Sequence, residues 1–145
     1  MLPDRRARLI VIAILGLLLS GCGQGVLEAS SAPGFVLEPI DGSDVKKVIL
    51  TEETADLIGV ETADVRTGSR GLATLPADAV LYDPDGATWV YTSPEEHVYV
   101  RVQIKVATIK AGVAELWDGP APMTKVVTVG VAELFGTENG VGDPE

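Results

Sequence analysis

One stretch of the sequence decides the fold class: HVYVRVQIKV, residues 97–106. Every second position is aliphatic, namely Val98, Val100, Val102, Ile104 and Val106. The positions between them are His97, Tyr99, Arg101, Gln103 and Lys105. Because successive side chains of a strand point to opposite faces, this pattern predicts a long strand with one dry and one solvated face. On the solvated face, we interpret His97 as a solvent-exposed histidine rather than a ligand.

The residues before this stretch predict a β-hairpin. Two short runs with strand character, at 81–82 and 88–91, flank Asp83-Pro84-Asp85-Gly86. Pro84 fixes the first inner turn position, Asp85 tolerates the second, and Gly86 supplies a positive φ. Asp83 and Asp85 are too few oxygen donors for a calcium loop, so turn formation explains these two aspartates better.

Further short strands are predicted at residues 45–50, 60–65, 113–117 and 125–129. A helix is predicted at 52–58, with Thr51 as its N-cap and Gly59 as its stop, and a final turn at 132–135. Short strands with turn signals about every ten residues are typical of antiparallel sheets. The expected fold is therefore mainly β, a small antiparallel roll, sandwich or barrel with one short helix.

The only cysteine follows a signal-like segment. Three arginines precede an apolar run of residues 9–19, which is too short for the roughly 20 residues of a transmembrane helix. Leu19-Ser20-Gly21-Cys22 resembles the lipobox of bacterial lipoproteins, which implies cleavage before Cys22 and a diacylglycerol on its sulfur. The alternatives are an ordinary secretory signal with an incidental cysteine, and a catalytic thiol that would need His97 as its base.

These features predict four zones. They are a signal peptide (1–21), a flexible Gly, Ser and Pro-rich tether (22–44), a β-domain (45–135) and a disordered acidic tail (136–145). The formal net charge of the chain is −10, which argues against binding to nucleic acid. We therefore expect the protein to reach a membrane through its lipid, on the periplasmic or outer side of the cell envelope.

The sequence shows no chemical machinery of a known type. It contains no nucleophile elbow, phosphate-binding glycine loop or metal-ligand spacing, so we expect no enzyme activity and no cofactor beyond the lipid. Glu52, Glu53 and Asp56 are interpreted as a solvated helix face rather than metal ligands. Trp89, Tyr91 and Tyr99 are candidates for a partner-contact patch, with core packing as the default explanation.

Several segments resemble one protein family. Residues 79–92 (AVLYDPDGATWVYT), 98–101 (VYVR) and 126–134 (VVTVGVAEL) resemble the C-terminal, membrane-proximal region of periplasmic adaptor proteins, also called membrane fusion proteins, of efflux and export pumps. Residues 50–55 and 58–65 are similar to the segment that precedes the first lipoyl half in heavy-metal and multidrug members. Only residues 66–75 lie where a full adaptor has its lipoyl domain, its helical hairpin and most of its β-barrel.

The resemblance implies a lipid-anchored accessory module of a transport complex, with an inner-membrane permease or a full-length adaptor as its partner. The hairpin that reaches an outer-membrane channel in full adaptors is absent from this sequence. A stand-alone lipoprotein that binds a small ligand or metal ion is the second hypothesis, and a structural remnant without a present role is another.

Overall fold

The computed structural model describes residues 34–141. In chain order its elements are β1 (Phe35–Pro39), β2 (Lys46–Leu50), α2 (Glu52–Ile58), β3 (Glu61–Asp64), β4 (Arg66–Thr67), β5 (Ala73–Pro76), the 3-10 helix η1 (Ala77–Ala79), β6 (Leu81–Tyr82), β7 (Thr88–Glu95), β8 (Val98–Lys110), β9 (Val113–Asp118), β10 (Lys125–Val129) and α3 (Val131–Glu138). The fold is mainly β, as predicted, with a nearly closed, barrel-like antiparallel sheet.

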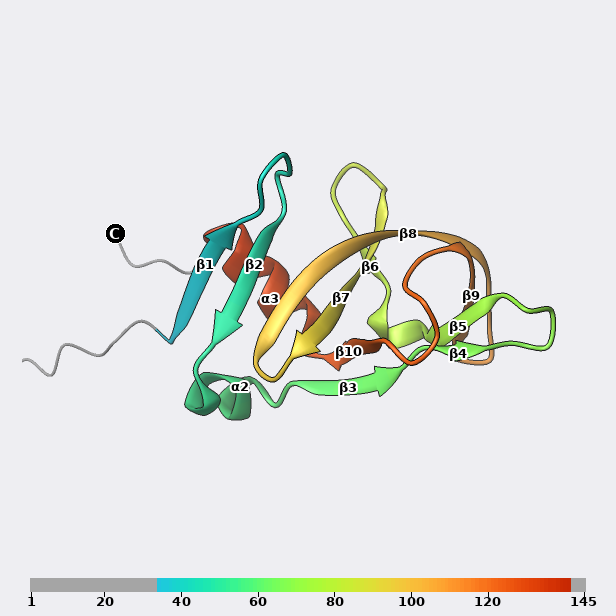
Figure 1. The fold of residues 1–145 in the computed structure, drawn as a ribbon, viewed down its shortest axis with the longest axis horizontal. Helices are drawn as coiled ribbons and strands as arrows, with labels where there is room; N and C mark the ends of the chain where they lie inside the picture. Colours follow the sequence, from blue (N-terminus) through green and yellow to red (C-terminus); the bar gives the residue numbers. More distant parts are fainter. Residues whose placement is uncertain (1–33, 142–145) are drawn as a thin grey trace, which may run out of the picture. The chain divides into compact units, whose positions relative to one another are not determined.

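The long strand β8 organises the sheet. Its first half pairs with β2 on one side and β7 on the other, and its second half pairs with β9. The strand order β3-β10-β7-β8-β9-β5-β4 forms the barrel-like part, while β1 adds to β2 and β6 adds to β7. Figure 1 shows β8 curving across the molecule from the side of β2 to that of β9.

The central strands are buried on both faces. On β7, Val90 and Tyr91 are both fully buried, and on β10 the same holds for Val126 and Val127. Neighbouring residues of a strand point to opposite sides, so each pair supplies two separate hydrophobic clusters. The strands therefore form a wall between two cores.

The first core, which we call the barrel cluster, lies inside the curved sheet and has only apolar members. They are Val65, Leu75, Ala79, Val90, Ile104, Ala114, Leu116 and Val126. The second core, which we call the helix cluster, lies between the sheet and the helices α2 and α3. Its members are Val48, Leu50, Ala55, Tyr91, Tyr99, Val127 and Leu134.

The helix α2 forms where the sequence predicts it. The Thr51 hydroxyl accepts from the Thr54 N–H at 3.2 Å, and Gly59 ends the helix in a left-handed conformation at φ 70°. The Gly59 N–H then bonds to the carbonyls of Ala55 and Asp56. The Asp83–Gly86 turn is also as predicted, because Gly86 has φ 83° and its N–H bonds to the Asp83 carbonyl at 3.0 Å.

Two predicted boundaries are wrong. The predicted tether contains β1, which pairs with β2 from Phe35 to Pro39, because Phe35 and Leu37 pack against the helix cluster. The predicted tail contains the end of α3. The short turn predicted at residues 132–135 is therefore part of a helix of eight residues. The folded domain therefore extends beyond residues 45–135 at both ends.

The prediction that one face of β8 is solvated is also wrong in part. Tyr99 is only 4% exposed and the Arg101 side chain only 11% exposed. Tyr99 belongs to the helix cluster, and Arg101 contacts residues of α3. Elements distant in sequence thus cover a face that alternation alone assigns to water.

Candidate functional site

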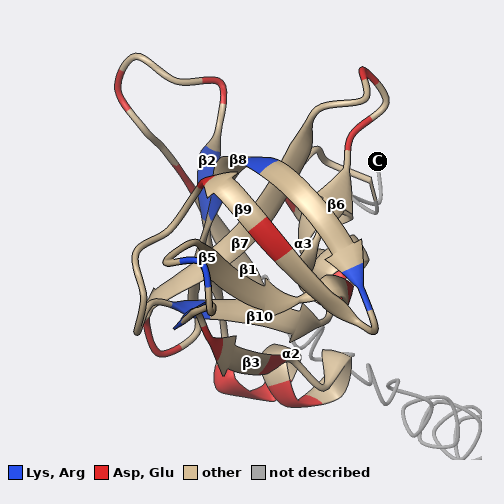
Figure 2. Ribbon diagram, turned by 90° about the vertical axis from the view of Figure 1, so that its right-hand side faces the viewer, with Lys and Arg blue, Asp and Glu red and all other residues tan. Residues whose placement is uncertain are grey.

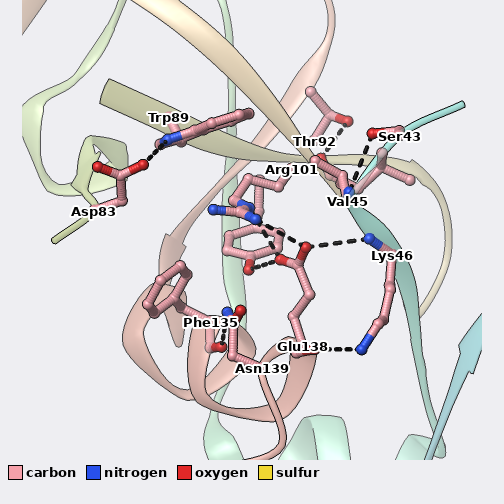
Figure 3. Close-up of polar contacts among 12 residues, drawn as sticks. Ser43, Val45, Lys46, Asp83, Trp89, Thr92, Arg101, Phe135, Glu138 and Asn139 are labelled. Atoms are coloured by element: carbon pink, nitrogen blue, oxygen red, sulfur yellow. Dashed lines mark hydrogen bonds and ion pairs between the residues drawn. The ribbon is translucent and has the colours of Figure 1, made fainter. Parts of the chain in front are cut away.

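A buried carboxylate marks the most unusual part of the structure. Glu138, in the last turn of α3, is 2% exposed and is the buried charged residue among the described ones. Its Oε2 accepts from the Tyr91 hydroxyl at 2.5 Å, and its Oε1 accepts from the Lys46 N–H at 3.1 Å (Figure 3). An ionised carboxylate is tolerated in a core only with such partners.

Arg101 supplies the balancing charge. Its Nη2 donates to Glu138 Oε1 at 3.1 Å, and its Nε lies 3.1 Å from Oε2 as an ion pair, without the alignment of a hydrogen bond. The guanidinium carbon lies 4.4 Å from the centre of the Trp89 ring and 5.2 Å from that of Phe135. Planar guanidinium groups stack favourably on aromatic rings. Arg101 is thus fixed between two rings and one carboxylate.

The turn before β7 holds Trp89 in place. The Trp89 indole N–H donates to Asp83 Oδ2 at 2.8 Å. Asp83 Oδ1 accepts from the N–H groups of Asp85 at 3.0 Å and Ala87 at 2.8 Å. The bond from Trp89 is the main cause that lowers the pKa of Asp83 below its ordinary value. The turn carboxylate therefore stays ionised and fixes the orientation of the indole.

Tyr91 is held in its neutral form. Burial raises the pKa of its phenol far above the ordinary value, and the hydrogen bond to the Glu138 carboxylate raises it further. A neutral phenol is a hydrogen-bond donor. Tyr91 therefore stabilises the charge of Glu138 instead of competing with it.

An open cleft of about 670 Å³ lies over this arrangement. It separates the β1–β2 loop from the β6–β7 turn. Its lining residues are Gly42, Ser43, Asp44, Val45, Asp83, Pro84, Asp85, Trp89, Arg101, Phe135 and Asn139. This cleft combines aromatic rings, a guanidinium and several carboxylates, so it offers fixed groups for recognising another molecule.

A second hollow of about 470 Å³ lies beside the β7–β8 turn. His97 lines it from a left-handed backbone conformation at φ 60°, with its Nε2 3.9 Å from Glu96 Oε1 and 30% of its side chain exposed. Asp56 from α2 and Glu95 also line it. His97 is therefore a half-exposed turn residue and does not begin β8 as predicted.

The predicted site residues lie in different parts of the protein. Cys22 lies outside the described residues. Tyr91 and Tyr99 are 0% and 4% exposed, so the default explanation, core packing, applies to both, and they do not form the alternative partner-contact patch. Trp89 stays partly exposed and lines the cleft. Within residues 34–141, no group of three His, Cys, Asp or Glu side chains is arranged to hold a metal ion.

Sequence reasoning missed three residues of the site: Arg101, Phe135 and Glu138. Arg101 alternates with valines and therefore resembles a solvated strand residue. Counted from Val131, Leu134 lies three positions later, Phe135 four and Glu138 seven. This i, i+3, i+4, i+7 spacing is that of one helix face, so it signals that Glu138 points inward with the apolar residues.

Comparison with known protein families, curated proteins and solved structures gives no match to this chain. The resemblance to periplasmic adaptor proteins thus stays a prediction from short sequence patterns. Among residues 34–141, neither α2 nor α3 has the length and apolar character needed to cross a membrane. The function must therefore be argued from the sequence and from the geometry of the fold.

Proposed function

We propose that this protein is a lipid-anchored, adaptor-like module of a membrane transport complex, which acts by contacting another protein of that complex. The observation that carries the proposal is the way in which two separated segments complete one sheet. These are the two segments that resemble different regions of an adaptor.

The pairing of these segments is extensive. β3 lies within residues 58–65, and β2 ends at Leu50, where the similar segment 50–55 begins; β7, β8 and β10 contain parts of the C-terminal segments 79–92, 98–101 and 126–134. β2 pairs with β8, with Val48 opposite Tyr99, and β3 pairs with β10, with Ala63 opposite Val126. Such long-range strand pairing is what a shortened adaptor needs if its two chain ends are to form one domain.

The connection between the segments is compact. Residues 66–75 contain β4 and the start of β5, which pair through Arg66 opposite Thr74 and Thr67 opposite Ala73. The Gly68 N–H bonds to the Leu72 carbonyl at 2.7 Å and closes the turn. A two-stranded hairpin thus occupies the position at which a full adaptor inserts its other domains.

The proposed anchor explains how such a module works without a large interface. A lipid on Cys22 confines the domain to the membrane surface, and tethering raises the effective concentration of a nearby partner. Contacts that are weak in solution then suffice. The acidic charge of the chain supports a protein partner over an anionic lipid surface.

Crosslinking in membranes tests the proposal. Cells expressing the full chain are treated with a mild amine-reactive crosslinker, and the product is identified by mass spectrometry. We expect a transporter permease or a full-length adaptor to be captured by the wild-type chain. The Cys22→Ala variant, which has no lipid attachment point, should capture much less of the same subunit. Recovery of no transport subunit by the anchored protein contradicts the proposal.

The second candidate function is a lipoprotein that binds a small molecule. The cleft favours it, because its volume of about 670 Å³ lies within the range of ligand pockets and its walls carry both aromatic and polar groups. Calorimetry with metal ions and with candidate transport substrates separates the two functions. Saturable binding of one of these compounds, together with a failure to crosslink, would favour the second function.

A further inference from the structure

The cleft over Arg101 lies between two acidic loops. The β1–β2 loop carries Asp41 and Asp44, and the β6–β7 turn carries Asp83 and Asp85. Figure 2 shows both loops, with red segments, projecting from the same end of the molecule on either side of the sheet. Side chains from both loops line one cleft, so a molecule that enters it meets carboxylates from two directions.

The charge balance of the cleft is negative. Arg101 is the cation that lines it, and the buried carboxylate of Glu138 already matches this charge. Asp44 and Asp85 are exposed, and neither forms an ion pair with a described residue. Asp83 remains ionised because its pKa is lowered. The cleft therefore attracts a cationic group and repels an anionic one.

The floor of the cleft carries a hydrogen-bond donor. Arg101 has 11% of its side chain exposed, its buried Nε faces Glu138 Oε2, and its Nη1, which forms no hydrogen bond with a described residue, keeps contact with solvent. Figure 3 shows the guanidinium with its remaining nitrogen directed away from Glu138. A guanidinium presents five N–H donors, so Nη1 is free to donate to an acceptor oxygen of a molecule that enters the cleft. An occupant with an acceptor oxygen as well as a positive charge therefore matches both the floor and the rim of the cleft.

The walls restrict the occupant further. Trp89, Pro84 and Phe135 line the cleft beside the acidic rim. Lysine and arginine side chains lay their methylene stems along apolar surfaces while the charged group stays in water. A peptide that carries these residues also has backbone carbonyls, which are acceptors. A bare metal ion brings a charge but neither an acceptor nor a stem.

We infer that this cleft docks a basic peptide segment of the partner protein. A lysine or arginine of the segment lies between Asp44 and Asp85, its stem packs on the aromatic wall, and a backbone carbonyl accepts from Arg101 Nη1. The inference rests on the proposed function, because it describes the chemistry of the partner of the anchored module. It places the contact at the β1–β2 and β6–β7 loops instead of the predicted tyrosine patch.

Nuclear magnetic resonance of the full-length chain in detergent micelles tests the inference. The probe is a short peptide with blocked ends in which lysine alternates with glycine, and the controls replace lysine with glutamate or glutamine. We expect the lysine peptide to shift the indole N–H resonance of Trp89 in a saturable way. The indole of Trp117, which is 67% exposed on β9 and does not line the cleft, serves as an internal control and should not shift.

Matched variants give the test its specificity. The double variant Asp44→Asn/Asp85→Asn removes the two unpaired rim charges, and we expect binding to weaken about threefold to tenfold, as for the loss of two exposed ion pairs. Asp56→Asn/Glu61→Gln removes the same charge from α2 and β3 and should leave the affinity unchanged. All four positions are exposed, so neither variant should disturb the core.

Three results would overturn the inference. They are no shift of Trp89 with the lysine peptide, equal binding of the glutamine or glutamate peptide, and equal weakening by both double variants. A fourth result would also overturn it: if free lysine with a blocked amino group binds as tightly as the peptide, the cleft is a small-cation site and not a peptide-docking site. Each of these results leaves the crosslinking test untouched, so failure of the inference and failure of the proposed function can be told apart.

Discussion

The barrel cluster and the helix cluster lie on opposite faces of the same strands, yet they are closed in different ways. The barrel cluster is sealed by the curved sheet itself and holds only apolar side chains. The helix cluster is sealed by β1, β2, α2 and α3 and adjoins the ionic contacts of Glu138. One core thus depends on alternation within strands, and the other depends on where the two chain ends pack.

This difference suggests a role for the buried ion pair. Burying a charge pair is weak evidence for stability, because desolvation offsets much of the attraction. Its geometric demands are strict, however, since Glu138 bonds to groups from β2, β7 and β8 at once. Our hypothesis is that these bonds fix the position of α3 on the sheet, and with it one wall of the cleft.

The largest expected effect comes from breaking this pair. Arg101→Met leaves the Glu138 carboxylate buried without a cation, which should cost about 3–5 kcal/mol of unfolding free energy. The double variant Arg101→Met/Glu138→Met removes both charges and should cost less than the single variant. Urea denaturation of the three proteins gives the comparison. A double variant less stable than the single one would show that the pair itself is not the source of the loss.

The barrel cluster should respond to lost volume instead. Leu116 is 1% exposed, and Leu116→Ala should cost about 2–5 kcal/mol, because truncation leaves a cavity in a close-packed core. The next residue of β9, Trp117, points outward, and Trp117→Ala should change stability by about 0.5 kcal/mol or less. Thermal unfolding measures both. Similar losses for the two variants would contradict the placement of β9 in the barrel.

The same contrast explains how far the sequence predicts the fold. Signals that are local in the sequence are found where they are expected: the long strand β8, the turn at Gly86 and the cap at Thr51. These signals are local because each depends on the geometry of a few neighbouring residues. The sequence assigns β1 to the tether and the end of α3 to the tail. Both elements form because they pack against residues that are distant in the chain.

The candidate site is less predictable than the fold. Trp89 and the aspartates of the turn are recognisable from the sequence, but Arg101 looks solvated until α3 is placed over it. The sequence alone leaves core packing and a partner-contact patch as the two explanations of Tyr91 and Tyr99, and both residues lie in the helix cluster. Helical spacing signals that Glu138 points inward, but its pairing with Arg101 is not evident from the sequence because the two residues lie 37 positions apart.

A smaller effect is expected from the phenol of Tyr91. Tyr91→Phe removes one hydrogen bond to a carboxylate that keeps its other donors, which should cost about 2 kcal/mol. The variant also tests a pH dependence. The pKa of Tyr91 is raised in the folded state, so the unfolded chain loses this proton first, above the ordinary tyrosine pKa of about 10.

The direction of this pH dependence follows from the number of protons bound by the folded and the unfolded states. Above a pH of about 10 the unfolded state binds fewer protons than the folded state, so stability falls as the pH rises. Tyr91→Phe should make this alkaline fall less steep. Burial also raises the pKa of Tyr99, so part of the fall should remain in the variant. Urea midpoints measured between neutral and alkaline pH would contradict the assignment if the wild-type and variant slopes agree.

The smallest effect should appear in acid, at the rim of the cleft. The pKa of Asp83 is lowered, chiefly by the bond from Trp89, so its contribution is present above the ordinary aspartate pKa of about 3.9 and is lost as the pH falls through the lower folded value. The Trp89 indole N–H resonance should therefore titrate with a midpoint below 3.9, and Asp83→Asn should abolish that step. The barrel cluster has no ionisable member, so its core contains no group that titrates. An indole resonance of Trp117 that titrates together with that of Trp89 would show instead that the whole sheet responds, and the two cores would not be separable.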